Sequence, residues 1–279
     1  MMSESDKLLQ IRNLVVAYEG VVALNDVSFD IAADEVHAVL GEDGAGKTTL
    51  MKVVSGYIPA GGYSGQIGLN GEPLLQRSIK DGLQNGIAMV PRKIALFDNM
   101  SIAENITMTR GEVKGRFTFS RRAAHDDAAA LLSRWEIAVP LDADVRSLSP
   151  LQRRQVMIAS ALAVEPQLLM LDEPLAGMPD ARSVSVLVRM VRRIAEGGVT
   201  CLFLAARPAD ATLVADTITA LRDGEVAGRW RRDAFDEATL AAAIASQRGY
   251  DPQRNVQHED FAERPGPLDH WFKGIGRRP

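Results

Sequence analysis

Residues 41–48 read Gly-Glu-Asp-Gly-Ala-Gly-Lys-Thr and match the pattern G-x-x-x-x-G-K-[ST]. Glycines let a loop curve so that its backbone N–H groups face an anion. In such a loop Lys47 can reach the β- and γ-phosphates of a nucleotide, and the Thr48 hydroxyl can bind Mg²⁺. The spacing therefore predicts an ATP-binding loop, and the alternative is a flexible glycine turn with a solvated lysine. The residues expected to contact the nucleotide are Gly41, Glu42, Asp43, Gly44, Ala45, Gly46, Lys47, Thr48 and Thr49.

Two acidic residues, Asp172 and Glu173, follow directly after the apolar run 168–171. In phosphate-loop enzymes an aspartate at the end of such a strand holds Mg²⁺. We expect Asp172 and Thr48 to bind the metal, and Glu173 to be the catalytic base that polarises a water molecule. A solvated turn at a strand end is the alternative, but the phosphate-binding loop earlier in the chain favours the catalytic interpretation.

These candidates need a scaffold, and the hydrophobic pattern predicts one of alternating strands and helices. Strands that alternate with helices form a largely parallel sheet covered on both faces. The phosphate-binding loop lies between a predicted strand and a predicted helix, which is the context that such a loop requires. The predicted strands are 8–18, 21–31, 35–40, 65–69, 87–90, 167–171, 199–205, 217–222 and 225–229, and the predicted helices are 48–54, 78–84, 122–135, 152–163, 181–196 and 235–245.

The composition is that of an ordinary globular protein and excludes several classes of function. The 279 residues are 46% hydrophobic and 24% charged, and the net charge is −4, whereas a general nucleic-acid binder is usually basic. A single cysteine, Cys201, excludes a disulfide framework and a cysteine-based zinc finger. No run approaches the ~18 apolar residues of a membrane span, and the polar start lacks a signal-peptide stretch. We expect a cytoplasmic protein without a nucleic-acid partner.

Taken together, the motifs resemble the nucleotide-binding domain of ATP-binding cassette (ABC) transporters over residues 7–248. Tyr18 precedes the second strand where that family stacks an aromatic side chain on adenine, although an aromatic residue can also simply end a strand. The sequence Leu-Ser-Pro-Leu-Gln at 148–152 stands where the family signature LSGGQ belongs. The resemblance implies an α/β P-loop NTPase (RecA-like) core with a mostly parallel sheet, an N-terminal antiparallel β subdomain and an inserted α-helical subdomain at about 100–165. A flexible tail is expected at 249–279.

Three family positions outside the signature carry unexpected residues. Arg92 replaces the glutamine of the loop that contacts Mg²⁺; arginine cannot bind a metal, although it can pair with a phosphate. Pro179 replaces an aspartate of a loop at the dimer interface, and Asp180 follows one residue later. Ala206 replaces the histidine that contacts the γ-phosphate, and alanine has no donor to offer. The resemblance therefore implies that ATP binding is retained and that hydrolysis is slow.

The signature is altered at both of its glycines, by Pro150 and Leu151. Ser149 as the N-cap residue with proline at the first helical position is a favourable helix start. Pro150 has no N–H to donate, and Leu151 puts a branched side chain where a γ-phosphate should approach. Gln152 is retained. We therefore expect an intact helix whose phosphate-sensing surface is degraded.

The sequence of residues 86–106 resembles that of cassettes of monosaccharide importers, particularly of the xylose type. This implies an ATP-binding subunit on the inner face of the cell membrane that couples ATP binding and hydrolysis to import of a small molecule, a sugar. The implied partners are a transmembrane permease subunit, a second cassette in a homodimer or heterodimer, and a substrate-binding protein. Two alternatives stay open: a non-hydrolytic regulatory or structural subunit paired with an intact cassette, and a soluble non-transport ABC or other P-loop protein.

Overall fold

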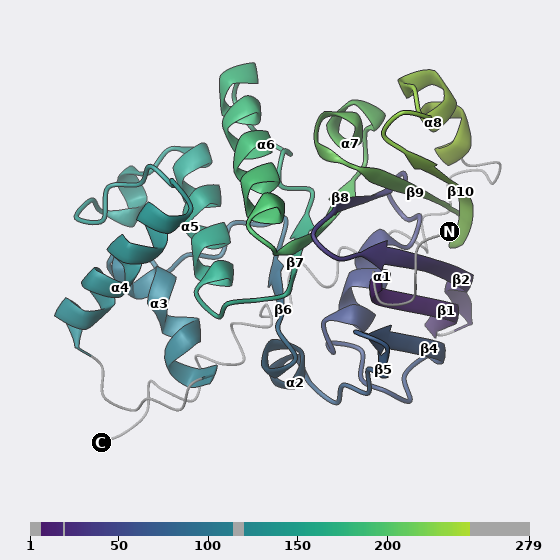
Figure 1. Ribbon diagram of the computed structural model, residues 1–279, viewed down its shortest axis with the longest axis horizontal. Helices are drawn as coiled ribbons and strands as arrows, with labels where there is room; N and C mark the ends of the chain where they lie inside the picture. Colours follow the sequence, from purple (N-terminus) through teal and green to yellow (C-terminus); the bar gives the residue numbers. More distant parts are fainter. Residues whose placement is uncertain (1–6, 19, 114–119, 246–279) are drawn as a thin grey trace.

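The computed structural model describes residues 7–18, 20–113 and 120–245, and the tail predicted at 249–279 lies outside the described residues (Figure 1). The strands are β1 (Lys7–Tyr18), β2 (Val21–Ala32), β3 (Val36–Leu40), β4 (Ser64–Leu69), β5 (Glu72–Pro73), β6 (Ile87–Val90), β7 (Leu168–Asp172), β8 (Thr200–Ala205), β9 (Thr217–Arg222) and β10 (Glu225–Arg231). The helices are α1 (Lys47–Val54), α2 (Ile79–Gln84), α3 (Ile102–Val113), α4 (Arg121–Arg134), α5 (Pro150–Leu162), α6 (Ala181–Glu196), α7 (Pro208–Val214) and α8 (Glu237–Ile244), with a 3₁₀ turn at Val145–Ser147.

The central sheet has six strands in the order β10-β9-β3-β8-β7-β6. All neighbours from β9 to β6 run parallel, and only β10 is antiparallel to its neighbour. Strands β3 and β8 are buried along their whole length, which explains their continuous apolar sequences. Because parallel strands end at one edge, the segments that follow β3, β6, β7 and β8 meet there. Ligands of such sheets bind outside the carboxyl ends of the strands.

A second, four-stranded sheet has the order β2-β1-β4-β5 and is antiparallel throughout. Helix α1 packs between the two sheets, because one cluster of buried residues joins Leu50 and Val54 of α1 with Leu14 of β1 and Leu204 of β8. This sandwich fixes the start of α1, which directly follows the phosphate-binding loop. The predicted antiparallel N-terminal subdomain and mostly parallel core are confirmed.

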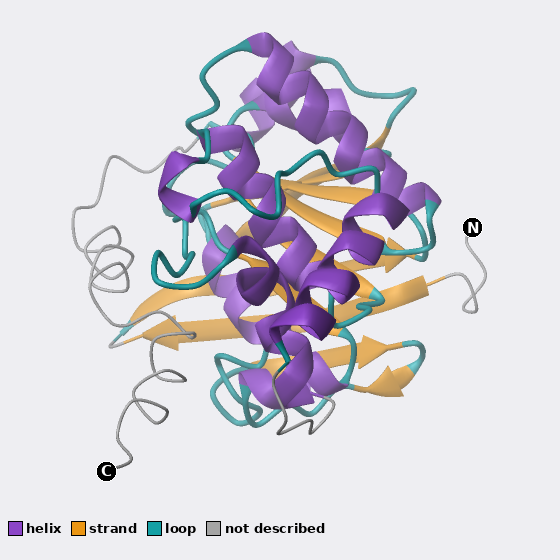
Figure 2. Ribbon diagram, turned by 90° about the vertical axis from the view of Figure 1, so that its left-hand side faces the viewer, coloured by secondary structure: helices purple, strands orange, loops and turns teal. Residues whose placement is uncertain are grey.

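Helices α3, α4 and α5 pack on one another and lie in front of the strands in Figure 2. Their apolar faces continue into the core that covers the central sheet, through Ile102, Ile106, Leu132 and Ile158. Helix α7 and strand β5 were absent from the sequence prediction, because seven and two residues are too few to show a hydrophobic period. None of the helices in the described ranges is both long and apolar enough to cross a membrane.

Candidate functional site

The loop after β3 is shaped by two glycines that no other residue can replace without a clash. A Cβ atom at Gly46 would lie 2.6 Å from the Leu24 side chain and 2.7 Å from the Ala23 carbonyl, and its φ is +101°. A Cβ atom at Gly41 would lie 2.6 Å from the Leu221 carbonyl. The loop backbone is therefore packed tightly against β2 and β9, unlike the flexible turn that was the alternative interpretation.

The start of α1 presents unpaired backbone donors to this loop. Gly46, the residue just before α1, has no side chain that could cap the helix, and the first turn of α1 contains no acidic residue. The first N–H groups of a helix have no partner within it and carry partial positive charge. Together with the curved loop they form a backbone site for an anion such as a phosphate group.

Lys47 is the first residue of α1, and its side chain is only 5% exposed. Its ammonium group donates to the carbonyls of Gly41 at 2.6 Å and Glu42 at 3.0 Å, and lies 3.5 Å from Oε1 of Glu173. Burial lowers the pKa of Lys47, and the charges of Glu173 and Asp43 oppose that effect. The ammonium thus bridges the loop and the acidic pair, where an incoming phosphate would compete for it.

Asp172 ends β7 and is the carboxylate expected to hold Mg²⁺ with Thr48. Burial raises the pKa of Asp172 to about 6, and the neighbouring charge of Glu173 adds to the effect. A buried carboxylate of this kind gains when a cation binds it. No group of three or more metal-ligating side chains occurs in the described residues. Mg²⁺ at phosphate sites typically takes one or two carboxylates plus substrate oxygens, so the hydroxyl and carboxylate present here fit that ion.

Glu173, the candidate base, is held between two cations. Its backbone has φ +44°, a left-handed conformation that costs ~1–3 kcal/mol for a residue with a side chain and that clusters at functional sites. The side chain is 9% exposed, with Oε1 facing Lys47 at 3.5 Å and Oε2 facing Arg92 at 3.1 Å. Each carboxylate oxygen of Glu173 therefore faces a cation.

Arg92 follows β6 and touches both acids of the site. Its guanidinium group pairs with Glu173, and its backbone N–H donates to the Asp172 carboxylate. The side chain is 54% exposed, so it approaches Glu173 from the solvent side. An arginine at position 92 can pair with a phosphate; in the structure its partner is the candidate base Glu173, and a phosphate contact stays a prediction.

Arg154 of α5 is a residue that the sequence interpretation missed. It is 2% exposed, and its two terminal nitrogens donate to the carbonyls of Pro91 and Arg92, both at 2.7 Å. Burial lowers the pKa of Arg154, and the charge of Asp172 opposes that effect. Position 154 lies on the helix row of Leu151 and Ile158, which faces the core, and a buried arginine must find acceptors. That row is the signal that could have identified it.

Helix α5 begins with a complete capping box at Ser149 and Gln152, within the segment that stands where the family signature is expected. The Ser149 hydroxyl accepts the Gln152 backbone N–H at 3.2 Å, and the Gln152 side chain accepts the Ser149 N–H at 3.0 Å. Helix α5 therefore starts at Pro150, two residues before the predicted start at 152. The two retained polar residues of the signature are bonded to each other, and Leu151 is half-buried.

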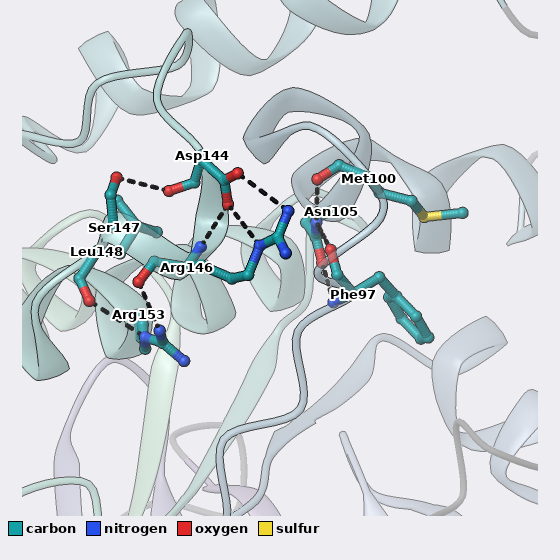
Figure 3. A network of polar contacts seen from close by, with 8 residues as sticks. All are labelled: Phe97, Met100, Asn105, Asp144, Arg146, Ser147, Leu148 and Arg153. Carbon is teal, nitrogen blue, oxygen red and sulfur yellow. Dashed lines mark hydrogen bonds and ion pairs between the residues drawn. The ribbon is translucent and has the colours of Figure 1, made fainter.

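The segment before α5 is cross-braced (Figure 3). Arg153 donates to the carbonyls of Leu148 at 3.1 Å and Arg146 at 3.0 Å, and Arg146 pairs with Asp144 at 3.3 Å. In the same view, the buried amide of Asn105 donates to the carbonyls of Phe97 and Met100 and accepts the Phe97 N–H. The same amide also donates to the Ser101 carbonyl, which the view does not include. Both segments are thus held in one conformation by bonds to their own backbone.

Tyr18, the expected adenine partner, is half-buried at the end of β1. Burial raises the pKa of Tyr18, while the neighbouring Thr49 hydroxyl lowers it. Neither of these two buried hydroxyls has a well-formed hydrogen bond within the described ranges. The ring is therefore next to the first turn of α1, and its hydroxyl retains bonding capacity.

The remaining two altered positions lie at loop starts near the same sheet edge. Pro179 is exposed, and Asp180 caps α6 by accepting the Ser183 N–H at 2.7 Å, so Asp180 is already engaged. Ala206 follows β8, and the next residue, Arg207, makes two bonds to Asp210 at 2.9 and 2.7 Å. Neither Pro179 nor Ala206 therefore supplies a side-chain donor to the site.

The site can now be compared with known proteins. Residues 24–176 match the family described as ABC transporter. A xylose import ATP-binding protein of Geobacillus kaustophilus is 32% identical over 257 residues, covering 90% of this chain and 50% of the relative. A ribose import ATP-binding protein of Rubrobacter xylanophilus is 36% identical over 276 residues, covering 97% of this chain and 52% of the relative. The chain thus spans about half the length of these relatives.

A solved ATP-binding cassette of an ABC transporter superposes with a TM-score of 0.74 at 19% identity, over 86% of this chain and 99% of that one. At this identity the likeness concerns the fold. A second solved cassette, bound to ADP and phosphate as a dimer, has a TM-score of 0.69 at 20% identity, over 82% of this chain and 100% of that one. The family match covers more than half of the 279 residues, so this chain belongs to the ABC transporter family and has the fold of its ATP-binding cassettes.

Proposed function

We propose that this chain is an ATP-binding cassette that couples ATP binding and hydrolysis to import of a small molecule, a sugar. The observation that carries the proposal is the convergence of the glycine-shaped loop, Lys47 and the acidic pair at one edge of the sheet. The sugar assignment is supported by relatives whose names state xylose and ribose import. We take residues 7–248 as the cassette, with its helical subdomain at about 100–165.

The proposed partners follow from the same assignment. A second cassette, identical or different, would complete each nucleotide site, and a membrane permease would carry the sugar. A substrate-binding protein would deliver the sugar to that permease. The chain would then act on the inner face of the cell membrane.

Hydrolysis would use the residues as they are placed. The loop N–H groups and Lys47 would bind the phosphates, and Tyr18 would stack on adenine. Thr48 and Asp172 would hold Mg²⁺, which would supply charge neutralisation for the phosphates. Water attacks the γ-phosphorus, the bond from that phosphorus to the β–γ bridging oxygen breaks, and ADP leaves with the bonding electrons. Glu173 accepts the proton of the attacking water.

We further propose that turnover is slow. The loss of one preorganised donor typically costs ~10²–10³ in kcat. Ala206 has no side-chain donor, Pro150 has no N–H, and the Ser149 hydroxyl accepts a bond inside the capping box. The same capping box favours the second candidate, a subunit that binds ATP without hydrolysing it and pairs with an intact cassette.

Turnover of the purified chain, with and without its permease, tests the proposal and separates the two candidates. We expect ATP binding together with a low rate that Glu173→Gln abolishes. Binding without any turnover, even with the permease present, would favour the non-hydrolytic subunit. A rate typical of intact cassettes that Glu173→Gln leaves unchanged would contradict the proposed role of this site.

A further inference from the structure

The ion pair between Arg92 and Glu173 bears on both nucleotide binding and proton transfer at the site. Of the two acids at the site, Glu173 forms ion pairs with both Lys47 and Arg92, and the charges of these two cations also act on Asp172. Lys47 also donates to two loop carbonyls, so its contacts are shared between the loop and the acid. Arg92 makes its side-chain contact with Glu173 at 3.1 Å.

Arg92 is held in place from three directions. Its guanidinium group contacts Glu173, its N–H contacts Asp172, and its carbonyl accepts a 2.7 Å bond from the buried Arg154. Arg154 also binds the preceding carbonyl, of Pro91, at 2.7 Å. The backbone at Arg92 is thus fixed by buried charged groups, although 54% of its side chain is exposed.

Nucleotide binding changes the partners of the two cations differently. The phosphates of an incoming triphosphate would draw Lys47 toward the loop, because a phosphate carries more charge than the carbonyls it replaces. Glu173 would then face the γ-phosphate with Arg92 as its remaining cation. Arg207, which also lies near enough to be influenced by Glu173, is bound to Asp210 through two bonds.

We propose that Arg92 is a positioning residue that stays paired with Glu173 when ATP binds. The pair reduces the repulsion between the Glu173 carboxylate and the γ-phosphate, which strengthens binding of a triphosphate more than of a diphosphate. The same pair holds one carboxylate oxygen away from the attacking water, which slows proton transfer. This inference rests on the proposed ATP site. The Arg92–Glu173 pair makes the site bind ATP strongly and hydrolyse it slowly.

Arg92→Gln tests the inference through affinity and rate together. We expect ATP affinity to fall about fivefold, the scale of a partly exposed ion pair, with a smaller change for ADP. We expect kcat to rise in the same variant. Arg189→Gln removes an equal charge from the exposed face of α6, where Arg189 contacts Ser185. This control should change neither the ATP affinity, nor the ADP affinity, nor kcat.

A double-mutant cycle identifies the partner of Arg92. In a Glu173→Gln background, adding Arg92→Gln should no longer alter the ratio of ATP to ADP affinity, because the pair is already broken. Affinities measured by calorimetry suffice here, so the cycle does not depend on turnover. Arg92→Lys keeps the charge and should restore ATP affinity to near the wild-type value.

Two results would overturn the inference. One is an ATP affinity and kcat that both stay unchanged in Arg92→Gln. The other is an equal loss of ATP affinity in both backgrounds together with a lower kcat, which would mean that Arg92 contacts the phosphate itself. A wild-type chain that binds no ATP would instead contradict the proposed function, so the two failures are distinguishable.

Discussion

Arg154→Met removes the buried charge that joins helix α5 to the loop after β6. Methionine keeps much of the length of the arginine stem, so the change isolates the guanidinium contacts from the packing. The variant leaves two carbonyls, those of Pro91 and Arg92, without the donors that now lie 2.7 Å away. These two carbonyls belong to the loop whose Arg92 contacts Glu173.

The expected loss of stability follows from these contacts. A buried acceptor left without a donor costs ~1–3 kcal/mol. Two acceptors would cost ~2–6 kcal/mol, and part is offset because the guanidinium group no longer has to be desolvated. We therefore expect the free energy of unfolding to fall by ~2–4 kcal/mol, or about 5–10 °C in the unfolding midpoint for a chain of this size.

Urea and thermal unfolding, followed by circular dichroism, measure this loss. Arg153→Met is the matched control, because Arg153 is the neighbouring residue on α5 and also donates to two carbonyls, but from a partly exposed position where water can replace it. The control should cost less than ~1 kcal/mol. Equal, small losses in both variants would refute the structural role assigned to Arg154.

Three further predictions concern the loop, the signature and a buried histidine. Gly46→Ala should abolish nucleotide binding in calorimetry, since its Cβ would lie 2.6 Å from a neighbouring side chain, whereas Gly61→Ala, with φ +96° and open space, should cost only about 1 kcal/mol of stability. Ser149→Ala should lower stability by ~1 kcal/mol in urea unfolding through loss of the N-cap, without unfolding the chain. Burial lowers the pKa of His37, so the unfolded chain binds its proton more readily and stability should decrease as pH falls below the unfolded pKa of about 6.5; unfolding midpoints should depend less on pH in His37→Gln.

Local features of the site were predictable from the sequence. The phosphate-binding loop, its preceding strand and its following helix are contiguous, and their glycine spacing and apolar run are recognisable without the fold. Asp172 ends a strand that is otherwise apolar and Glu173 follows it, so their position at a sheet edge was also predictable. The start of α5 could be predicted in kind, because serine followed by proline is a strong helix start.

The contacts between distant segments were not predictable in this way. Arg154 and Arg92 are 62 residues apart, and they meet only because α5 packs against the end of β6. The pairing of Arg92 with Glu173 depends likewise on two adjacent parallel strands bringing their ends together. The sequence alone shows that an arginine at position 92 cannot bind a metal, whereas its pairing with Glu173 is a property of the folded chain.

Calorimetric titration of the purified chain with ATP and Mg²⁺ measures directly whether the site binds the nucleotide. Lys47→Ala removes the buried ammonium at the loop, and Lys80→Ala removes an exposed one on α2 as the control. We expect saturable ATP binding by the wild type and by Lys80→Ala, and loss of binding in Lys47→Ala. Equal ATP affinity in all three proteins would contradict this expectation.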